Sequence, residues 1–450
     1  MHSQSASAGH AHSVSRGPLF RGPLSRGLAA AALAGSLFLA GAASAADLPQ
    51  GDPANLGLAP DRLETITAML KEKVDQQLFP GAVLTIVRHG EVGYQQAVGK
   101  RTPGGPEMTT DSLFRIYSMT KPIVTVAAMM LVEEGKLTIG DPVARYIPEF
   151  KELQVAVDQP GGGEAQMEPA RRPITVQDLM RHTAGLTYGF FGAGAARKAY
   201  LDNGIGDPAK TNEEFAKAIA QMPLEHQPGT TWEYSHATDV LGRVVEVVSG
   251  QPLGAFLKAR IFDPLDMQDT GFEVADTGNH GRIAEPMESD RQIGPVALYN
   301  PAESRAWESG GGGLVSTARD YSRFLQMMLN GGELDGVRIL GPKTIAFMTA
   351  DHLGPDIKPG KYYLPGPGYG FGLGFAVRTS EGLSNVPGSV GEYYWGGAAG
   401  TYFWVDPAED MFVVYMMQSP KHRVPMRSVL RDMVYGAVVE SGAQMQQGSN

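Results

Sequence analysis

Hydrophobic and polar residues recur along this chain with two different periods, and its first ordered segments show both. Residues 61–78 carry aliphatic side chains at three- and four-residue spacing, which predicts an amphipathic helix that ends before Pro80. Residues 81–87 and 91–98 have a strand-like pattern and flank Arg88-His89-Gly90, a turn typical of a β-hairpin. A helix followed by a hairpin is therefore expected early in the chain.

The central part of the chain predicts helices and the last part predicts mainly strands. Helical patterns cover residues 119–135, 175–180, 240–248, 253–261, 317–329 and 426–439, and strand patterns cover 369–377, 393–405 and 411–417. Residues 153–172 and 190–208 are polar or rich in Gly and Ala, and we expect irregular loops there. Because strands lie at both ends with helices between them, the pattern predicts a mixed α+β fold whose sheet is built from both termini.

Composition narrows the class of protein. The 450 residues are 42% hydrophobic and 19% charged, which is typical of a globular chain. The net charge of −10 provides no basic footprint, so we expect no nucleic-acid partner. Cysteine is absent, which excludes disulfides and zinc–thiolate sites, and the ten histidines show no metal-ligand spacing. We expect neither a metal nor an organic cofactor.

The first 45 residues have the features of a secretory signal peptide. Arg21 and Arg26 precede an apolar stretch over residues 28–43, and Ala43-Ser44-Ala45 provides a small-residue cleavage site. The stretch is shorter than the roughly 20 residues of a membrane span. We expect a mature periplasmic or secreted protein that begins at Ala46, forms one domain over 46–450 and has no membrane span. An uncleaved N-terminal anchor is the alternative.

Ser118 and Lys121 are the strongest candidates for chemistry. Three residues apart on a helix, their side chains lie on one face, so the lysine amine can reach the serine hydroxyl. Ser118 is expected at the helix N-terminus, where free N–H groups favour developing negative charge. A desolvated neutral lysine can take the serine proton, as in acyl-transfer serine hydrolases of the Ser-Lys type. A Ser-x-x-Lys match is short, however, and also occurs by chance.

Two later motifs supply the remaining groups that such chemistry needs. The phenol of Tyr234 would relay a proton between Ser118, Lys121 and a leaving group if the fold brings them together. The segment Trp395-Gly396-Gly397-Ala398 begins a late strand, and its glycines permit close backbone approach. The N–H groups of Ser118 and Ala398 would then form an oxyanion hole. A packed aromatic residue and a strand bulge are the respective alternatives.

These motifs together resemble a known superfamily. Ser118-x-x-Lys121, then Tyr234-x-His236, then Trp395-Gly396-Gly397, in that order, resemble the serine β-lactamase/penicillin-binding-protein superfamily, as do the flanking segments 113–117, 179–186, 309–316 and 369–374. The resemblance covers roughly residues 60–439. It implies a β-lactamase/transpeptidase-like fold, with an antiparallel sheet flanked by helices and an inserted helical lobe. The sheet lobe would span approximately 60–115 and 300–440, and the helical lobe approximately 116–299.

The third motif distinguishes branches of this superfamily. β-Lactamases and D-Ala-D-Ala peptidases usually carry Lys-Thr-Gly there, whereas this chain carries Trp395, Gly396 and Gly397 and so looks most like the class C-like family VIII carboxylesterases. His236 stands where class C enzymes have Asn. The resemblance implies that these four residues contact substrate. From the sequence, His236 either orients Tyr234 or Lys121, or is structural.

The sequence therefore predicts an exported serine hydrolase, a carboxylesterase that cleaves small acyl esters. Ser118 would form the acyl-enzyme, Lys121 and Tyr234 would act as a coupled base, and the amides of Ser118 and Ala398 would hold the oxyanion. Two alternatives stay open: a class C-like β-lactamase or D-amino-acid peptidase, and a non-catalytic protein that binds peptidoglycan fragments. The expected partner is a small-molecule ester or amide. The natural substrate, the acyl-chain length and the oligomeric state are left open.

Overall fold

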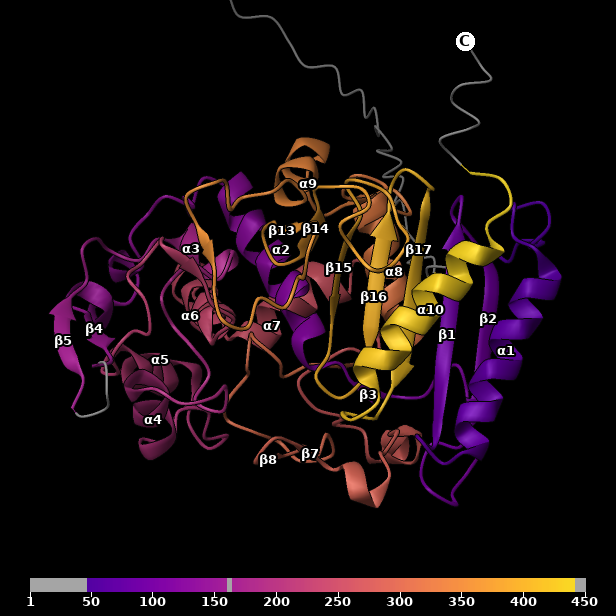
Figure 1. The fold of residues 1–450 in the computed structure, drawn as a ribbon, viewed down its shortest axis with the longest axis horizontal. Helices are drawn as coiled ribbons and strands as arrows, with labels where there is room; N and C mark the ends of the chain where they lie inside the picture. The colour runs from indigo at the N-terminus through magenta and orange to yellow at the C-terminus, as the bar shows by residue number, and fades with distance from the viewer. Residues whose placement is uncertain (1–46, 160–163, 442–450) are drawn as a thin grey trace, which may run out of the picture. The chain divides into compact units, whose positions relative to one another are not determined.

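A seven-stranded antiparallel sheet forms the centre of the molecule (Figure 1). The computed structural model describes residues 47–159 and 164–441, so the predicted signal segment lies outside the described residues. The strands in spatial order are β13 (Tyr369–Phe371), β14 (Ala376–Arg378), β15 (Tyr393–Gly396), β16 (Tyr402–Asp406), β17 (Met411–Met417), β1 (Gly81–Arg88) and β2 (Glu91–Gly99). Because β17 pairs with β1, both ends of the described chain build one sheet, as predicted.

Each face of this sheet is covered by helices. Alternate residues of β17 point to opposite faces, and both sets are buried and apolar. On one face, α1 (Pro60–Asp75) and α10 (Arg423–Ala437) lie side by side (Figure 1). On the other face lies α8 (Ala318–Leu329), and α2 (Thr120–Glu133) belongs to the same hydrophobic core. This arrangement confirms the mixed fold that the resemblance implied.

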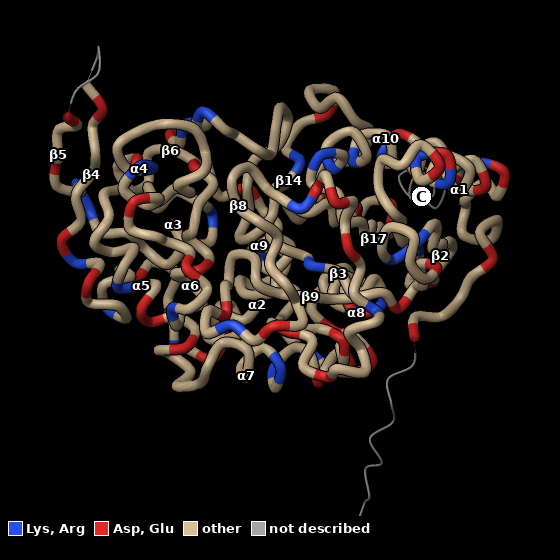
Figure 2. The backbone as a smooth tube through the Cα atoms, turned by 90° about the horizontal axis from the view of Figure 1, so that it is seen from below, with Lys and Arg blue, Asp and Glu red and all other residues tan. Residues whose placement is uncertain are grey.

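The remaining helices and short strands lie mostly between β2 and β13 in sequence. The helices are α3 (Val176–Met180), α4 (Ala195–Asp202), α5 (Asn212–Ala220), α6 (Ala237–Ser249), α7 (Leu253–Leu257) and α9 (Pro342–Met348). The paired short strands are β3 (Phe114–Arg115) with β9 (Val315–Ser316), β4 (Gln154–Val157) with β5 (Gln166–Pro169), β6 (Thr231–Trp232) with β12 (Lys358–Pro359), β7 (Gln292–Ile293) with β8 (Val296–Ala297), and β10 (Glu333–Leu334) with β11 (Val337–Arg338). Figure 2 shows basic and acidic positions interspersed along the described chain.

Local signals set several helix ends. Thr175 caps α3 in a capping box: its hydroxyl accepts the amide of Asp178, whose carboxylate accepts the amide of Thr175. Helix α6 ends at Gly250, which adopts the left-handed conformation that favours glycine. No single helix within residues 47–159 and 164–441 is long and apolar enough to cross a membrane. One bent pair in this described part, α6 with residues 253–262 at an angle of 75°, has the length and composition of a broken membrane span.

Four predicted segments are wrong in part. The expected loop 153–172 contains the hairpin β4–β5, whose pattern is polar because few of its side chains are buried, and the expected irregular segment 190–208 contains α4. The expected strand 369–377 is two strands, because the chain turns at Gly374, where a Cβ would lie 2.8 Å from the hydroxyl of Thr125. The expected strand 393–405 likewise divides into β15 and β16.

Helix α1 contributes to stability through one apolar stripe. Ile66 is fully buried in the core that α1 forms with α10 and the sheet. We therefore expect Ile66→Ala to lower the free energy of unfolding by about 2–5 kcal/mol, since the change removes buried methyl groups and leaves a cavity. Glu64→Ala, on the exposed face of α1, is the control and should change it by less than about 0.5 kcal/mol. Urea unfolding followed by circular dichroism measures both, and equal effects would contradict this packing.

Candidate active site

Ser118 lies at the entrance to helix α2, as predicted, but one turn of 3-10 helix precedes the α-helix. The turn covers Tyr117–Met119, and Tyr117 has a φ of 43°, a left-handed conformation that is costly for an aromatic residue. The preceding strand β3 is fixed by pairing with β9, and the amide of Ile116 donates to Leu314. The fold thus holds the backbone around Ser118 in a strained turn at a helix N-terminus.

Lys121 is fully buried one turn after Ser118. Its Nζ lies 3.4 Å from the Oγ of Ser118, 3.1 Å from the hydroxyl of Tyr188 and 2.6 Å from the carbonyl oxygen of Gly311. An amine buried without such partners would be strongly destabilising. The predicted Ser118–Lys121 pair is therefore formed, and two residues that the sequence did not single out complete its surroundings.

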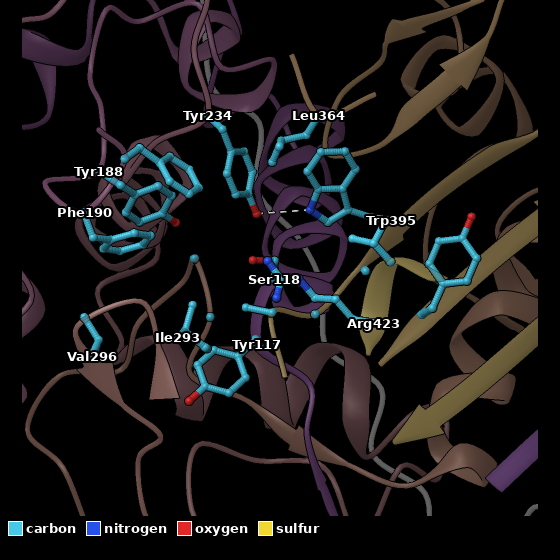
Figure 3. A pocket seen from close by; sticks show the side chains of 18 of the residues that line it. Tyr117, Ser118, Tyr188, Phe190, Tyr234, Ile293, Val296, Leu364, Trp395 and Arg423 are labelled. Carbon is cyan, nitrogen blue, oxygen red and sulfur yellow. Dashed lines mark hydrogen bonds between the residues drawn. The ribbon is translucent and has the colours of Figure 1, made fainter. Parts of the chain in front are cut away.

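Tyr234 joins this pair from the segment that follows β6. Its ring centroid lies 4.6 Å from the Nζ of Lys121, so the amine rests over the aromatic face. Its hydroxyl accepts a hydrogen bond of 3.1 Å from the indole Nε1 of Trp395, which Figure 3 shows as a dashed line above Ser118. Two of the sequence motifs, far apart in the chain, thus meet directly.

Tyr188 is the residue that sequence reasoning missed most clearly. It is buried, its ring stacks on Phe190 with centroids 5.0 Å apart, and its hydroxyl accepts from Lys121. Burial raises the pKa of Tyr188 well above its usual value, and nearby Tyr234 and Asp239 add to this shift. Tyr188 therefore stays a neutral phenol. The aromatic run from 188 to 191 is the signal that could have marked it.

His236 is hydrogen-bonded to Asp239, and no hydrogen bond joins it to Tyr234 or Lys121 among the described residues. Its Nδ1 lies 2.9 Å from the carboxylate of Asp239, one turn along α6. The other carboxylate oxygen accepts the amide of Gly311 at 2.9 Å and the hydroxyl of Ser309 at 2.5 Å. Because the carbonyl of Gly311 accepts from Lys121, a continuous chain of contacts joins His236 to the buried amine.

The charge state of Asp239 follows from these contacts. Burial by itself raises the pKa of Asp239, but the hydrogen bond and charge of His236, with Lys121 and Ser309, hold that pKa below its usual value. Asp239 therefore remains a carboxylate in the interior. His236 followed three residues later by an aspartate at a helix start is a sequence signal that could have identified this pair.

The Trp-Gly-Gly segment lies beside the Ser118 turn. The amide of Gly397 donates to the carbonyl of Thr401 at 2.8 Å, closing a short loop after β15. The hydroxyl of Thr401 donates to the carbonyl of Ile116 at 3.3 Å, which ties this loop to the segment that leads into Ser118. A Cβ at Gly397 would lie 2.5 Å from that same carbonyl oxygen, so the close approach requires glycine.

These residues line one cavity of about 1010 Å³. Ser118, Tyr234, Trp395 and Ala398 all contribute to its wall, together with Gly396, Gly397 and His236. Figure 3 shows Tyr188 and Phe190 on one side of Ser118 and Trp395 on the other. Within residues 47–159 and 164–441, no group of three His, Asp or Glu side chains is arranged to hold a metal ion.

His182 is a fully buried residue that packs against Tyr234. Its ring centroid lies 4.8 Å from that of Tyr234, its Nδ1 lies 3.3 Å from the hydroxyl of Ser235, and its Nε2 has no hydrogen-bond partner among the described residues. Burial lowers the pKa of His182 well below 6.5, and the charge of Lys121 adds to this effect. His182 is therefore neutral in the folded protein.

This neutrality gives a pH dependence of stability. Below about pH 6.5 the unfolded chain binds a proton at His182 that the folded chain does not, so folding stability should fall by up to about 1.4 kcal/mol per pH unit. His182→Asn suits the positive φ of 57° and cannot titrate. The stability advantage of the wild type over this variant should shrink from pH 7 to pH 5 in urea unfolding. A constant difference would contradict a neutral His182.

Comparisons with known proteins agree with this geometry. The family described as Beta-lactamase matches residues 66–433. Protein Rv1367c of Mycobacterium tuberculosis (strain ATCC 25618 / H37Rv) is 38% identical over 365 residues, which are 78% of this chain and 88% of that protein. Esterase EstB of Burkholderia gladioli is 32% identical over 394 residues, which are 82% of this chain and 94% of that protein.

A solved structure extends the likeness to three dimensions. EstCE1, a hydrolase with promiscuous acyltransferase activity, has a TM-score of 0.70 at 29% identity and covers 84% of this chain and 99% of its own. The matched region includes the Ser118 turn, Tyr234 and the Trp-Gly-Gly segment, which lie together at one cavity. The chain therefore belongs to the Beta-lactamase family and is a serine hydrolase.

Proposed function

We propose that this serine hydrolase is a carboxylesterase that cleaves small acyl esters through an acyl-enzyme on Ser118. The observation that carries the proposal is the buried amine of Lys121, 3.4 Å from the Oγ of Ser118, which itself lines the cavity with aromatic residues such as Tyr234 and Trp395. A base placed at this distance from a serine hydroxyl can remove its proton as the oxygen attacks. Residues 46–450 would form the single catalytic domain.

The base in this proposal is the pair Lys121 and Tyr234. The amine lies over the phenol ring and both groups are buried, so a proton taken from Ser118 can be shared between them. As Ser118 Oγ bonds to the ester carbonyl carbon, its proton passes to this pair. When the carbon–oxygen bond of the leaving group breaks, the alcohol takes a proton through Tyr234. Water then attacks the acyl-enzyme, releases the carboxylic acid and restores the serine.

The oxyanion would be held by the amides of Ser118 and Ala398. Ser118 supplies an N–H in the 3-10 turn that leads into α2, where the helix end favours negative charge. Ala398 follows Gly397 in the loop that the Thr401 hydroxyl ties to Ile116, and both Ser118 and Ala398 line the same cavity. Two fixed donors stabilise the tetrahedral intermediate more than the flat ester.

An ester is favoured over a β-lactam by Trp395. Its indole bonds to the Tyr234 hydroxyl and occupies the place where relatives with Lys-Thr-Gly carry a cation. His236, held by Asp239, replaces the amide expected of class C enzymes and would contact the acyl group with Gly396 and Gly397. EstB, which is called an esterase, supports the same choice. No residue of the proposed mechanism needs a metal or an organic cofactor.

Initial rates on p-nitrophenyl butyrate and a chromogenic cephalosporin test this proposal. We expect fast ester turnover, little lactam hydrolysis and a loss of at least about 10⁴-fold in Ser118→Ala, since the nucleophile is removed. Thr65→Ala, an exposed change on α1, is the matched control. Ester turnover that survives in Ser118→Ala would contradict the nucleophile. Lactam hydrolysis as fast as ester hydrolysis would make the protein a β-lactamase, and turnover of neither substrate would favour a peptidase or a binding protein.

We also propose that residues 1–45 direct export and are removed, which leaves a periplasmic or secreted enzyme. The basic residues, the short apolar stretch and the small residues up to Ala45 support this. Expression of the full chain in a Gram-negative host should place the protein in the periplasmic fraction, with an intact mass that begins at Ala46. A full-length mass in the membrane fraction would instead indicate an uncleaved anchor.

A further inference from the structure

We propose that Arg427 is a positioning residue of the oxyanion hole, which acts by orienting the peptide group between Gly397 and Ala398. This inference rests on the proposed function, because it requires that the amide of Ala398 holds the oxyanion. Arg427 lies on α10, about thirty residues after the Trp-Gly-Gly segment, and its side chain reaches back to that loop.

One nitrogen of Arg427 contacts both carbonyls that close the loop. Its Nη2 donates to the carbonyl of Gly397 at 2.9 Å and to the carbonyl of Thr401 at 3.3 Å. The Gly397 carbonyl also accepts the amide of Gly400 at 3.2 Å. The guanidinium therefore joins the two sides of the loop that carries Ala398.

Peptide geometry transmits this contact to the oxyanion donor. The carbonyl of Gly397 and the N–H of Ala398 belong to one peptide group, which is planar, so their directions are fixed relative to each other. A donor that holds the carbonyl on the α10 side consequently sets where the N–H points. A charged donor on the carbonyl also polarises the peptide, and this strengthens the hydrogen bond that the N–H can give.

The two glycines of the motif make this arrangement sterically possible. A Cβ at Gly396 would lie 2.3 Å from the Nη2 of Arg427, and a Cβ at Gly397 would lie 2.5 Å from the carbonyl oxygen of Ile116. The loop is thus confined between the guanidinium and the segment that leads into Ser118. Close contact on both sides fixes the Ala398 amide relative to the Ser118 amide.

Among the described residues no carboxylate forms an ion pair with Arg427, and the Nε of Arg427 is buried without a hydrogen-bond partner. Its guanidinium lies 5.1 Å from the ring centroid of Tyr402. The carbonyls of the loop are therefore the main groups that compensate its charge. Since Arg427 also lines the cavity, direct binding of a substrate anion is the competing role that an experiment must separate.

The test is Arg427→Gln assayed on two p-nitrophenyl esters, the neutral butyrate and the hemisuccinate, which carries a carboxylate. We expect kcat to fall by about 10²-fold on both, with KM changed by less than about threefold, since the lost interaction acts in the transition state. The inhibition constant of n-butylboronic acid, which forms a tetrahedral adduct with a serine, should rise by a similar factor. The melting temperature should change little.

Controls make each outcome decisive. Asp432→Asn changes an exposed residue of α10 that does not line the cavity, and it should leave kcat on the butyrate within about threefold. If Arg427→Gln misfolds, Arg427→Ala with added guanidinium replaces it, and rescue of kcat by guanidinium but not by ammonium is expected. A rise in KM on the hemisuccinate with kcat unchanged on both esters would overturn the positioning role. Failure of guanidinium to restore kcat in Arg427→Ala would overturn it as well.

The same assays separate this inference from the proposed function. Ester turnover that persists in Ser118→Ala would remove the acyl-enzyme and the inference with it. Turnover that is lost in Ser118→Ala but normal in Arg427→Gln would leave the esterase mechanism in place and overturn only the role of Arg427.

Discussion

The burial of Lys121 is the constraint on which the site depends. An amine with no exposure to water needs hydrogen-bond partners inside the protein, and they come from three separate segments, the Ser118 turn, the loop at Tyr188 and the glycine run at Gly311. The Gly311 segment is held in turn by the carboxylate of Asp239, which accepts a hydrogen bond from the amide of Gly311. A Cβ at Gly311 would lie 2.5 Å from that carboxylate, so the glycine run is a backbone cradle for the lysine and not simply a turn.

The sheet brings the remaining groups to this lysine. Strand β15 supplies Trp395 and ends at the Gly396 position, where the loop to Thr401 begins. Strands β3 and β9 fix the turn that carries Ser118. These strands are far apart in sequence, and the order of the sheet, with β17 beside β1, is what lets the last third of the chain reach a serine near its beginning. The site therefore depends on joining both ends of the described chain in one sheet.

The sequence predicted the helices and strands whose hydrophobic residues recur at regular spacing, and the site residues that belong to a recognisable motif. Helix α1, the β1–β2 hairpin and the Ser118–Lys121 pair are local patterns, and the structure forms each of them. The strand pattern over 369–377 did not reveal that the chain turns at Gly374, whose close approach to Thr125 on α2 is a contact between distant parts of the chain. Tyr188 and Asp239 carried only weak local signals, and their positions at the site, like that of Gly311, depend on contacts made across the fold.

The separation of Asp239 from Lys121 bears on how a buried lysine serves as a base. A carboxylate in direct contact with an amine favours the charged form of both. Here the Gly311 peptide stands between them, accepting from the amine with its carbonyl and donating to the carboxylate with its amide. The amine otherwise faces the Ser118 hydroxyl and the rings of Tyr188 and Tyr234. Among the described residues the acid is thus linked to Lys121 through one residue's backbone and forms no ion pair with it, which in the proposed mechanism leaves the amine able to take the proton of Ser118.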